Sequence, residues 1–316
     1  MQSFLVKCGY ILIKCDYFFV KCDCFITNTS FPKKRSLNAN CRRSPIVTIV
    51  GLYTSGPTCP GEICDIISNF ENKTSSGLDE ISPKVFKNLT PNLIVSLAHI
   101  FNLSLSQGEF INSFKSAKVL PIYKKKDKTD MGNYRPISLL PVASKILEKI
   151  MHVRLYSFLN KKGFFYENQF GFRREHSTDQ AAIVMTDKVT KALNKNLKVA
   201  SVFLDMSKAF DCVDHNILLH KLYKCGIRGV AYSWFVSYLT GRYQKVLVNG
   251  ILSENTCLIK HGVPQGSILG PLLYLIYVND CNNCLEHSNS ILYADKTTLV
   301  FVAKTLSTNK LGLRKL

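Results

Sequence analysis

The feature of this sequence that most constrains its fold is a pair of apolar runs that each lead into an aspartate. Residues 199–204 are typical of a buried strand and end at Asp205, and residues 291–294 are typical of a second strand and end at Asp295. Residues 298–302 predict a third strand, which forms a hairpin with the second. If this hairpin lies beside residues 199–204, the two carboxylates meet at one edge of one sheet.

Carboxylates in these positions call for a partner. Buried strands rarely end on a carboxylate unless it caps a turn, forms an ion pair or binds a cation. Asp205 and Asp295 could together hold a divalent metal ion, above all Mg²⁺, which prefers hard oxygen ligands. The alternative is that each aspartate is a turn or capping residue, since Asp295 is expected in a turn with Lys296.

The rest of the chain mixes helical and strand-like patterns. Residues 84–106 have apolar residues at helical spacing, and Pro91 divides this run into two pieces. Ser177 and Gln180 form a capping box that predicts a helix to about residue 193. Further helices are expected at 142–160, 216–223, 230–239 and 267–278, and further strands at 119–123 and 243–249. This mixture indicates an α/β or α+β fold.

The charge balance restricts the class of partner. The 316 residues include 41 Lys and Arg against 22 Asp and Glu, which gives a net charge of +19. Such a surplus favours a polyanionic partner, because Lys and Arg contacts to phosphates give affinity for any base sequence, and it disfavours acidic substrates. A membrane surface would need a basic amphipathic helix, which the sequence lacks. We therefore expect nucleic acid as partner and no membrane.

Residues 1–55 form a leader of a different character. A Val/Ile-Lys-Cys triplet recurs around Lys7, Lys14 and Lys21, which indicates a translated tandem DNA repeat more than a short coiled coil. We expect this leader to be poorly ordered. The 12 cysteines show no paired framework and no signal peptide precedes them, so a reduced, intracellular protein is expected. Cys212, Cys225 and Cys257 are expected to be ordinary buried residues.

Several motifs occur in a fixed order between residues 62 and 316. They are KTSSGLD at 73–79, AKVLPIYKK at 117–125, NYRPISL at 133–139, NQFGFR at 168–173, VFLDMSKAFD at 202–211, GVPQGSILGP at 262–271 and YAD at 293–295. In this order they closely resemble the reverse transcriptase of non-LTR (LINE-type, jockey-like) retrotransposons. The leader resembles nothing in that family.

The resemblance implies a fold and a reaction. The fold would be α+β, with the fingers and the antiparallel palm sheet of a right-hand polymerase. Residues 56–115 would be a pre-fingers extension, 116–198 the fingers and 199–316 a palm that ends before the thumb. The reaction would be template-directed addition of dNTPs to a DNA primer on an RNA template, with two Mg²⁺ ions.

The resemblance also implies roles for individual residues. Asp205 and Asp295 would be catalytic metal ligands. Phe210 would be an aromatic gate that rejects the 2′-hydroxyl of an NTP, although a core aromatic residue is the alternative. Lys118 and Arg135 would hold the triphosphate, Arg through its fork of donors and Lys as a point charge.

Two further positions complete the implied dNTP site. Gln265 and Gly266 would lie beside the incoming nucleotide and the template, where glycine lets the backbone approach closely. A glycine needed only for a turn is the alternative at Gly266. For Lys118 the alternative is a solvated surface lysine.

One position departs from the family pattern. The family has a second aspartate after Tyr-Ala-Asp, and here that residue is Lys296. A Lys ammonium repels a nearby cation by about 4 kcal/mol per pair of unit charges at a separation of about 4 Å and an effective dielectric of about 20. We therefore expect polymerisation to be severely reduced. The alternatives are a catalytically inactive nucleic-acid-binding remnant of the same fold and a product with no role.

Overall fold

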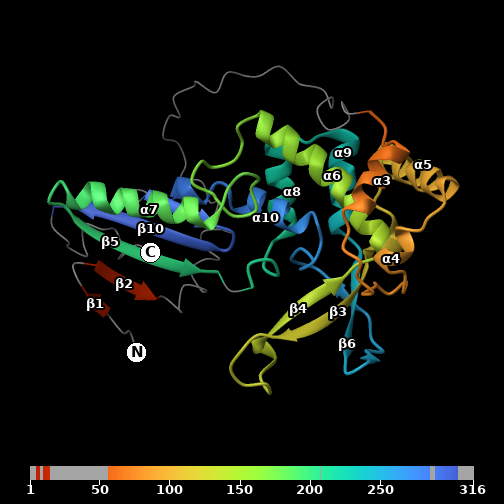
Figure 1. Cartoon of the computed structure of the whole chain (residues 1–316), viewed down its shortest axis with the longest axis horizontal. Helices are drawn as coiled ribbons and strands as arrows, with labels where there is room; N and C mark the ends of the chain where they lie inside the picture. The colour runs from red at the N-terminus through yellow and green to blue at the C-terminus, as the bar shows by residue number, and fades with distance from the viewer. Residues whose placement is uncertain (1–4, 8–9, 15–55, 207, 285–288, 305–316) are drawn as a thin grey trace. The chain divides into compact units, whose positions relative to one another are not determined.

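The chain divides into two compact units, each discontinuous in sequence (Figure 1). The computed structural model describes residues 5–7, 10–14, 56–206, 208–284 and 289–304. The first unit takes its described residues from Met1–Arg43, Phe165–Ala209 and Val278–Leu316, and the second from Ser44–Phe164 and Phe210–Tyr277. Both contain helices and sheets, which confirms the α+β class. The linear division into extension, fingers and palm stays a prediction.

The sheet of the first unit has the strand order β1-β2-β5-β10-β9. Its strands are β1 (Leu5–Lys7), β2 (Tyr10–Lys14), β5 (Lys198–Asp205), β9 (Asn289–Tyr293) and β10 (Lys296–Ala303). Strand β10 is antiparallel to both β5 and β9, whereas β2 is parallel to β5. The hairpin therefore lies beside the first aspartate-terminated strand, as the sequence predicts.

Helix α7 (Thr178–Leu193) covers one face of this sheet (Figure 1). It begins with the predicted capping box, in which Ser177 Oγ accepts a hydrogen bond from Gln180 N at 3.3 Å and Gln180 Oε1 accepts one from Ser177 N at 3.1 Å. Its half-buried apolar residues pack on a cluster formed by Phe170, Ala192, Val199, Ile291 and Val300. A second cluster is formed by Ala200, Val202, Leu299 and Phe301. Because side chains alternate along a strand, these clusters lie on opposite faces of the sheet.

A segment before α7 fixes the turn between β9 and β10. Residues 168–171 pair with β9 through two backbone hydrogen bonds of 2.8 Å. Gln169 Oε1 accepts hydrogen bonds from the backbone N–H groups of Gly171 at 2.9 Å and Ala294 at 3.3 Å. A Cβ atom on Gly171 would overlap the backbone nitrogen of Ala294 and lie 2.7 Å from its Cα. This packing determines the position of the turn that carries Asp295.

The sheet of the second unit has the order β4-β3-β6-β7, and β8 also pairs with β6. Its strands are β3 (Ser116–Tyr123), β4 (Tyr134–Leu139), β6 (Arg242–Val248), β7 (Ile251–Leu252) and β8 (Cys257–Ile259). Its helices are α3 (Pro60–Ser68), α4 (Pro83–Phe86), α5 (Pro91–Gln107), α6 (Val142–Lys161), α8 (His215–Lys224), α9 (Gly229–Leu239) and α10 (Gly270–Val278). Helix α6 contributes most to the core, including the fully buried Ile146, Leu147 and Ile150.

Most predicted elements are present, with differences that have local causes. The predicted division at Pro91 is confirmed: α4 ends at Phe86 and Pro91 begins α5, because proline is tolerated in the first turn of a helix, where its missing N–H would be unpaired. The predicted turn at Asp295-Lys296 is wrong by one residue. Ala294 adopts the left-handed conformation with φ of 56°, and Lys296 is already the first residue of β10. Cys212 and Cys257 are exposed and Cys225 is half-buried, so their predicted burial is wrong.

The leader contains the two short strands β1 and β2. The other residues of 1–55 lie outside the described part of the chain, so the predicted disorder of the leader stays a prediction. Among the described residues, no helix has the length and apolar character required to cross a bilayer.

Candidate active site

The two aspartates lie at the same end of the first unit's sheet. Asp205 is the last residue of β5, and its register partner on β10 is Lys296. Asp295 lies in the preceding turn, where its carbonyl oxygen accepts a hydrogen bond from the backbone N–H of Met206 at 3.1 Å. The structure thus brings the backbones of both aspartates together at one end of the neighbouring strands β5 and β10.

The Lys296 ammonium lies against one of the two carboxylates. Its Nζ is 3.5 Å from Asp205 Oδ1, and the side chains are 63% and 71% exposed. Directly opposite residues on antiparallel strands point to the same face, so the strand register itself places this pair together. An exposed pair of this kind contributes little to stability, at most about 1 kcal/mol. Its consequence is chemical, because a positive charge occupies the region where a cation would approach Asp205.

The donor set at this edge fits a metal ion poorly. Within the described residues, no group of three or more His, Cys, Asp and Glu side chains could hold a metal ion. Asp205 and Asp295 supply the oxygen atoms that Mg²⁺ prefers. Lys296 supplies an ammonium, which has no lone pair to donate. The side chains present therefore do not match the oxygen-only surroundings of a Mg²⁺ ion.

Asp205 and Lys296 also border a cavity of the first unit. The cavity has a volume of about 470 Å³ and lies between α7 and the ends of β5, β9 and β10. Its lining is largely apolar, with Met185, Phe203 and Tyr293 among the larger side chains. Asp205 and Lys296 are the charged residues of this lining.

In the second unit, Gln265 and Gly266 lie against strand β4. The backbone N–H of Ser138 donates to the carbonyl of Gln265 at 2.7 Å, and Gln265 Nε2 donates to Asp211 Oδ1 at 2.9 Å. Gly266 has φ of +119°, and a Cβ atom there would lie 2.6 Å from the carbonyl oxygen of Ser138. Glycine is therefore required by both the backbone conformation and the close approach of β4.

Phe210 adjoins this loop. Its carbonyl oxygen accepts a hydrogen bond from Val263 N at 2.8 Å, two residues before Gln265. The ring is half-buried and stacks on Tyr274, with centroids 5.0 Å apart and planes inclined by 28°. The structure thus brings Phe210, Gln265 and Gly266 into neighbouring segments of one unit.

Lys118 and Arg135 share the outward face of the β3–β4 ladder. Lys118 pairs with Leu139 and Ile122 pairs with Arg135, which places the two cations on the same face but about 13 Å apart along the strands. Neither forms an ion pair with any described residue. Lys245 on β6 is the register partner of Lys118, so this face carries a third positive charge that sequence reasoning missed.

Glu148 is the other residue that sequence reasoning missed. It is 0% exposed in the middle of α6 and contacts the loop that contains Gln265. The signal was present: Glu148 follows Leu147 within an apolar helical pattern, and glutamate is almost never fully buried unless it is paired.

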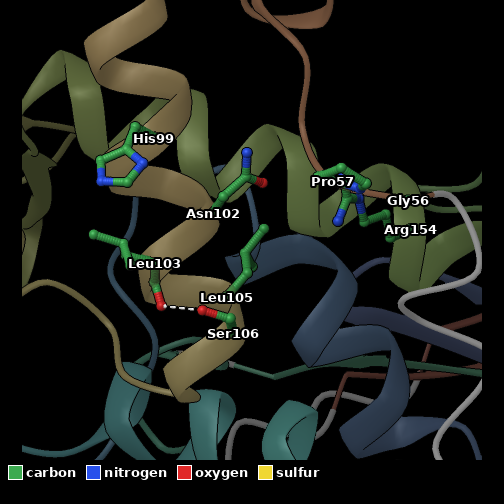
Figure 2. Close-up of a pocket in the computed structure, with 8 residues that line it drawn as sticks. All are labelled: Gly56, Pro57, His99, Asn102, Leu103, Leu105, Ser106 and Arg154. Atoms are coloured by element: carbon green, nitrogen blue, oxygen red, sulfur yellow. Dashed lines mark hydrogen bonds between the residues drawn. The ribbon is translucent and has the colours of Figure 1, made fainter.

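A further cavity, of about 350 Å³, lies beside α5 and contains none of the predicted site residues (Figure 2). Its lining includes Asn102, which exchanges hydrogen bonds with the backbone of Thr58 at 2.7 and 2.9 Å, and Arg154, whose Nη2 donates to Thr58 Oγ1 at 3.1 Å. Arg154 Nη2 also lies 3.6 Å from Glu62 Oε2. These contacts join α3, α5 and α6 and have a structural role.

Comparison with known proteins gives a consistent result. The family described as "Reverse transcriptase (RNA-dependent DNA polymerase)" matches residues 123–311. The "Probable RNA-directed DNA polymerase from transposon BS" of Drosophila melanogaster is 32% identical over 262 residues, which cover 80% of this chain and 29% of that protein. The "RNA-directed DNA polymerase from mobile element jockey" of the same species is 31% identical over 262 residues, which cover 80% and 28%.

The chain therefore spans less than a third of the length of these two relatives. Among solved structures, a chain of the "Partial Cas6-RT-Cas1--Cas2 complex" is 17% identical with a TM-score of 0.41, and the match covers 81% of this chain and 39% of that one.

Proposed function

The chain belongs to the reverse transcriptase (RNA-dependent DNA polymerase) family, in the branch found in non-LTR retrotransposons, and we propose that it is a polymerase domain whose chemistry is impaired by Lys296. The reaction is the template-directed addition of dNTPs to a DNA primer on an RNA template. We infer this impairment from the 3.5 Å separation of Lys296 Nζ from Asp205 Oδ1. The net charge of +19 supports a nucleic-acid partner.

The proposed catalytic groups are Asp205 and Asp295. Reverse transcriptases use divalent metal ions; Asp205 and Asp295 would be the residues to hold such an ion, which would supply Lewis-acid stabilisation of the charge on the transferred phosphate. The proximity of the Asp205 and Asp295 backbones at one end of the sheet supports this assignment. The ammonium of Lys296 opposes metal binding, because it adds a positive charge where two dications would have to bind.

The proposed nucleotide-binding groups lie in the second unit. Lys118 and Arg135 bind the triphosphate, a role supported by their position on one outward face with no ion-pair partner among the described residues. Phe210 selects against the 2′-hydroxyl of NTPs, and its partial exposure leaves part of the ring available for contact. Gln265 and Gly266 contact the nucleotide and the template, where the missing side chain of Gly266 allows close approach.

A second candidate function is binding of nucleic acid without catalysis. It is favoured by the same ion pair, since Lys296 opposes the metal ions but leaves the outward cations of the second unit unchanged. The two candidates predict the same binding and differ only in extension.

The experiment that tests the proposal measures binding and extension side by side. We expect the chain to bind an RNA–DNA primer–template with an affinity that falls steeply as salt rises, because phosphate contacts release counterions. We expect primer extension that is weak and requires a divalent metal. Extension without metal, or no salt-dependent binding, contradicts the proposal. Salt-dependent binding with no extension at any metal concentration favours the second candidate.

Neutralising the outward cations is expected to weaken binding of the nucleotide. Lys118→Gln and Arg135→Gln should each lower the affinity of the chain with its primer–template for dNTP, by about tenfold, because each removes a charged donor to the triphosphate. The control is Lys191→Gln, because that ammonium already pairs with Asp187 at 2.8 Å. Equal dNTP affinity for all three variants and the natural chain would show that Lys118 and Arg135 are merely solvated.

A further inference from the structure

Glu148 makes contacts that its place in a helix does not explain. It lies in the middle of α6 with no exposed surface. Its Oε2 accepts hydrogen bonds from the backbone N–H groups of Ile268 at 2.7 Å and Leu269 at 3.2 Å, while Oε1 accepts one from Ser144 Oγ at 3.3 Å. A carboxylate from one helix therefore binds the backbone of a loop about 120 residues further along the chain.

The two N–H groups lie directly before helix α10. Backbone N–H groups near the start of a helix lack partners within the helix and attract negative charge. Ser267 provides the local part of this arrangement, since its Oγ accepts a hydrogen bond from Gly270 N at 3.0 Å and donates one to the carbonyl of Pro264 at 2.8 Å. Glu148 provides the hydrogen-bond acceptor for the N–H groups of Ile268 and Leu269, which the loop itself lacks.

A buried carboxylate is unfavourable unless its surroundings compensate for the loss of water. Burial raises the pKa of the Glu148 carboxyl above its usual range, whereas the charge of Arg242 and the N–H donors lower it. Arg242 is itself 1% exposed, and its Nη1 donates to the carbonyl of Tyr238 at 3.0 Å. Two ionisable side chains are thus buried in the same region, where an apolar pair of similar volume could have packed.

The loop bound by Glu148 is the one that contains Gln265 and Gly266. Its first end is bound at Gln265 by Ser138 on β4 and by Asp211, as described above. Glu148 fixes its other end, at Ile268 and Leu269. The loop is therefore held at both ends by residues distant in sequence. Within the loop, Ser267 makes local hydrogen bonds to Pro264 and Gly270.

We infer that Glu148 is a positioning residue, which holds residues 264–269 so that Gln265 and Gly266 meet the incoming nucleotide in the correct place. This inference rests on the proposed role of Gln265 and Gly266 in nucleotide binding. Glu148 itself touches no substrate, because it has no exposed surface.

Two readouts test this role, and only one of them depends on polymerase activity. The first is hydrogen exchange of the amides of Ile268 and Leu269, compared with amides in the core of α6. We expect Glu148→Ala to speed exchange at these two amides at least tenfold more than in α6. Glu148→Gln, which retains one acceptor oxygen and the side-chain volume, should give a smaller increase and serves if the alanine variant does not fold.

The second readout is the KM for dNTP, measured in chains that also carry Lys296→Asp. We expect Glu148→Ala to raise this KM about tenfold, with a smaller rise for Glu148→Gln. The matched control is Glu62→Ala, which removes a carboxylate that faces the buried Arg154 and does not contact the loop. This control should change neither the local exchange nor the KM.

The outcomes separate the inference from the proposed function. Uniformly faster exchange over the whole second unit, or an unchanged KM, would overturn the positioning role. If exchange becomes locally faster but no chain with Lys296→Asp extends a primer, the proposed function fails, and with it the link from the loop to the nucleotide. Faster exchange confined to the amides of Ile268 and Leu269, together with a raised KM for dNTP, supports both the positioning role and the proposed function.

Discussion

Lys296→Asp is expected to increase metal-dependent primer extension about a thousandfold. In the natural chain the ammonium lies 3.5 Å from Asp205 Oδ1, so it repels a metal ion at this carboxylate. Each pair of unit charges at about 4 Å contributes about 4 kcal/mol at an effective dielectric of about 20. Since about 1.4 kcal/mol corresponds to a factor of ten in rate, removing one such repulsion gives the expected increase. The measurement is primer extension on an RNA template over a range of Mg²⁺ concentrations.

Three further variants make this result specific. Lys296→Gln removes the ammonium without adding a carboxylate, so it removes the same repulsion and should recover most of this increase. Lys304→Asp makes the same change of charge just beyond the other end of β10 and should have no effect. Asp205→Asn combined with Lys296→Asp should abolish extension. Equal extension by the natural chain and by Lys296→Asp would show that Lys296 is harmless.

Gly171→Ala is expected to destabilise the first unit by about 3 kcal/mol or more, at the upper end of the usual effect of overpacking. The added methyl group would overlap the backbone of Ala294, which cannot move aside as a flexible side chain could. Because Ala294 directly precedes Asp295, relief of this overlap has to displace the turn that carries the carboxylate. The free energy of unfolding in urea measures the first effect, and extension by the Lys296→Asp chain measures the second.

The control for this substitution is Gly61→Ala. Gly61 lies in helix α3, and the nearest atom to its added Cβ would be Cys59 Sγ at 3.8 Å, which is ordinary van der Waals contact. Alanine is favoured over glycine within a helix by about 0.5–1 kcal/mol, so this variant should be as stable as the natural chain or slightly more stable. Stability of Gly171→Ala equal to that of the natural chain would contradict the packing described for residues 168–171.

Features with a short-range cause were predictable from the sequence. The capping box of Ser177 and Gln180 fixed the start of α7, and the apolar runs before Asp205 and Asp295 located β5 and β9, which both pair with β10 in one sheet. The turn was misplaced by one residue, because the left-handed conformation of Ala294 is unusual for a residue other than glycine and has no signature in the sequence.

Features that depend on distant segments were not predictable in this way. The burial of Glu148 is compensated by the N–H groups of Ile268 and Leu269, and no local pattern identifies such partners. The pairing of Lys296 with Asp205 follows from the strand register, which the sequence constrains only through the alternation of apolar residues. Strand β4 was missed because Pro136 interrupts its pattern, although proline is compatible with a strand at the edge of a sheet.

The discontinuity of the first unit has a consequence for synthesis on the ribosome. Strand β5 is complete at Asp205, but its antiparallel neighbour β10 ends only at Ala303, after all of Phe210–Tyr277 has been translated. Until then one edge of β5 has unpaired backbone groups, and such edges promote association between nascent chains. The long separation between the two strands also slows their pairing. A stalled or prematurely terminated chain that ends before β10 therefore keeps this edge of β5 open to association with other chains.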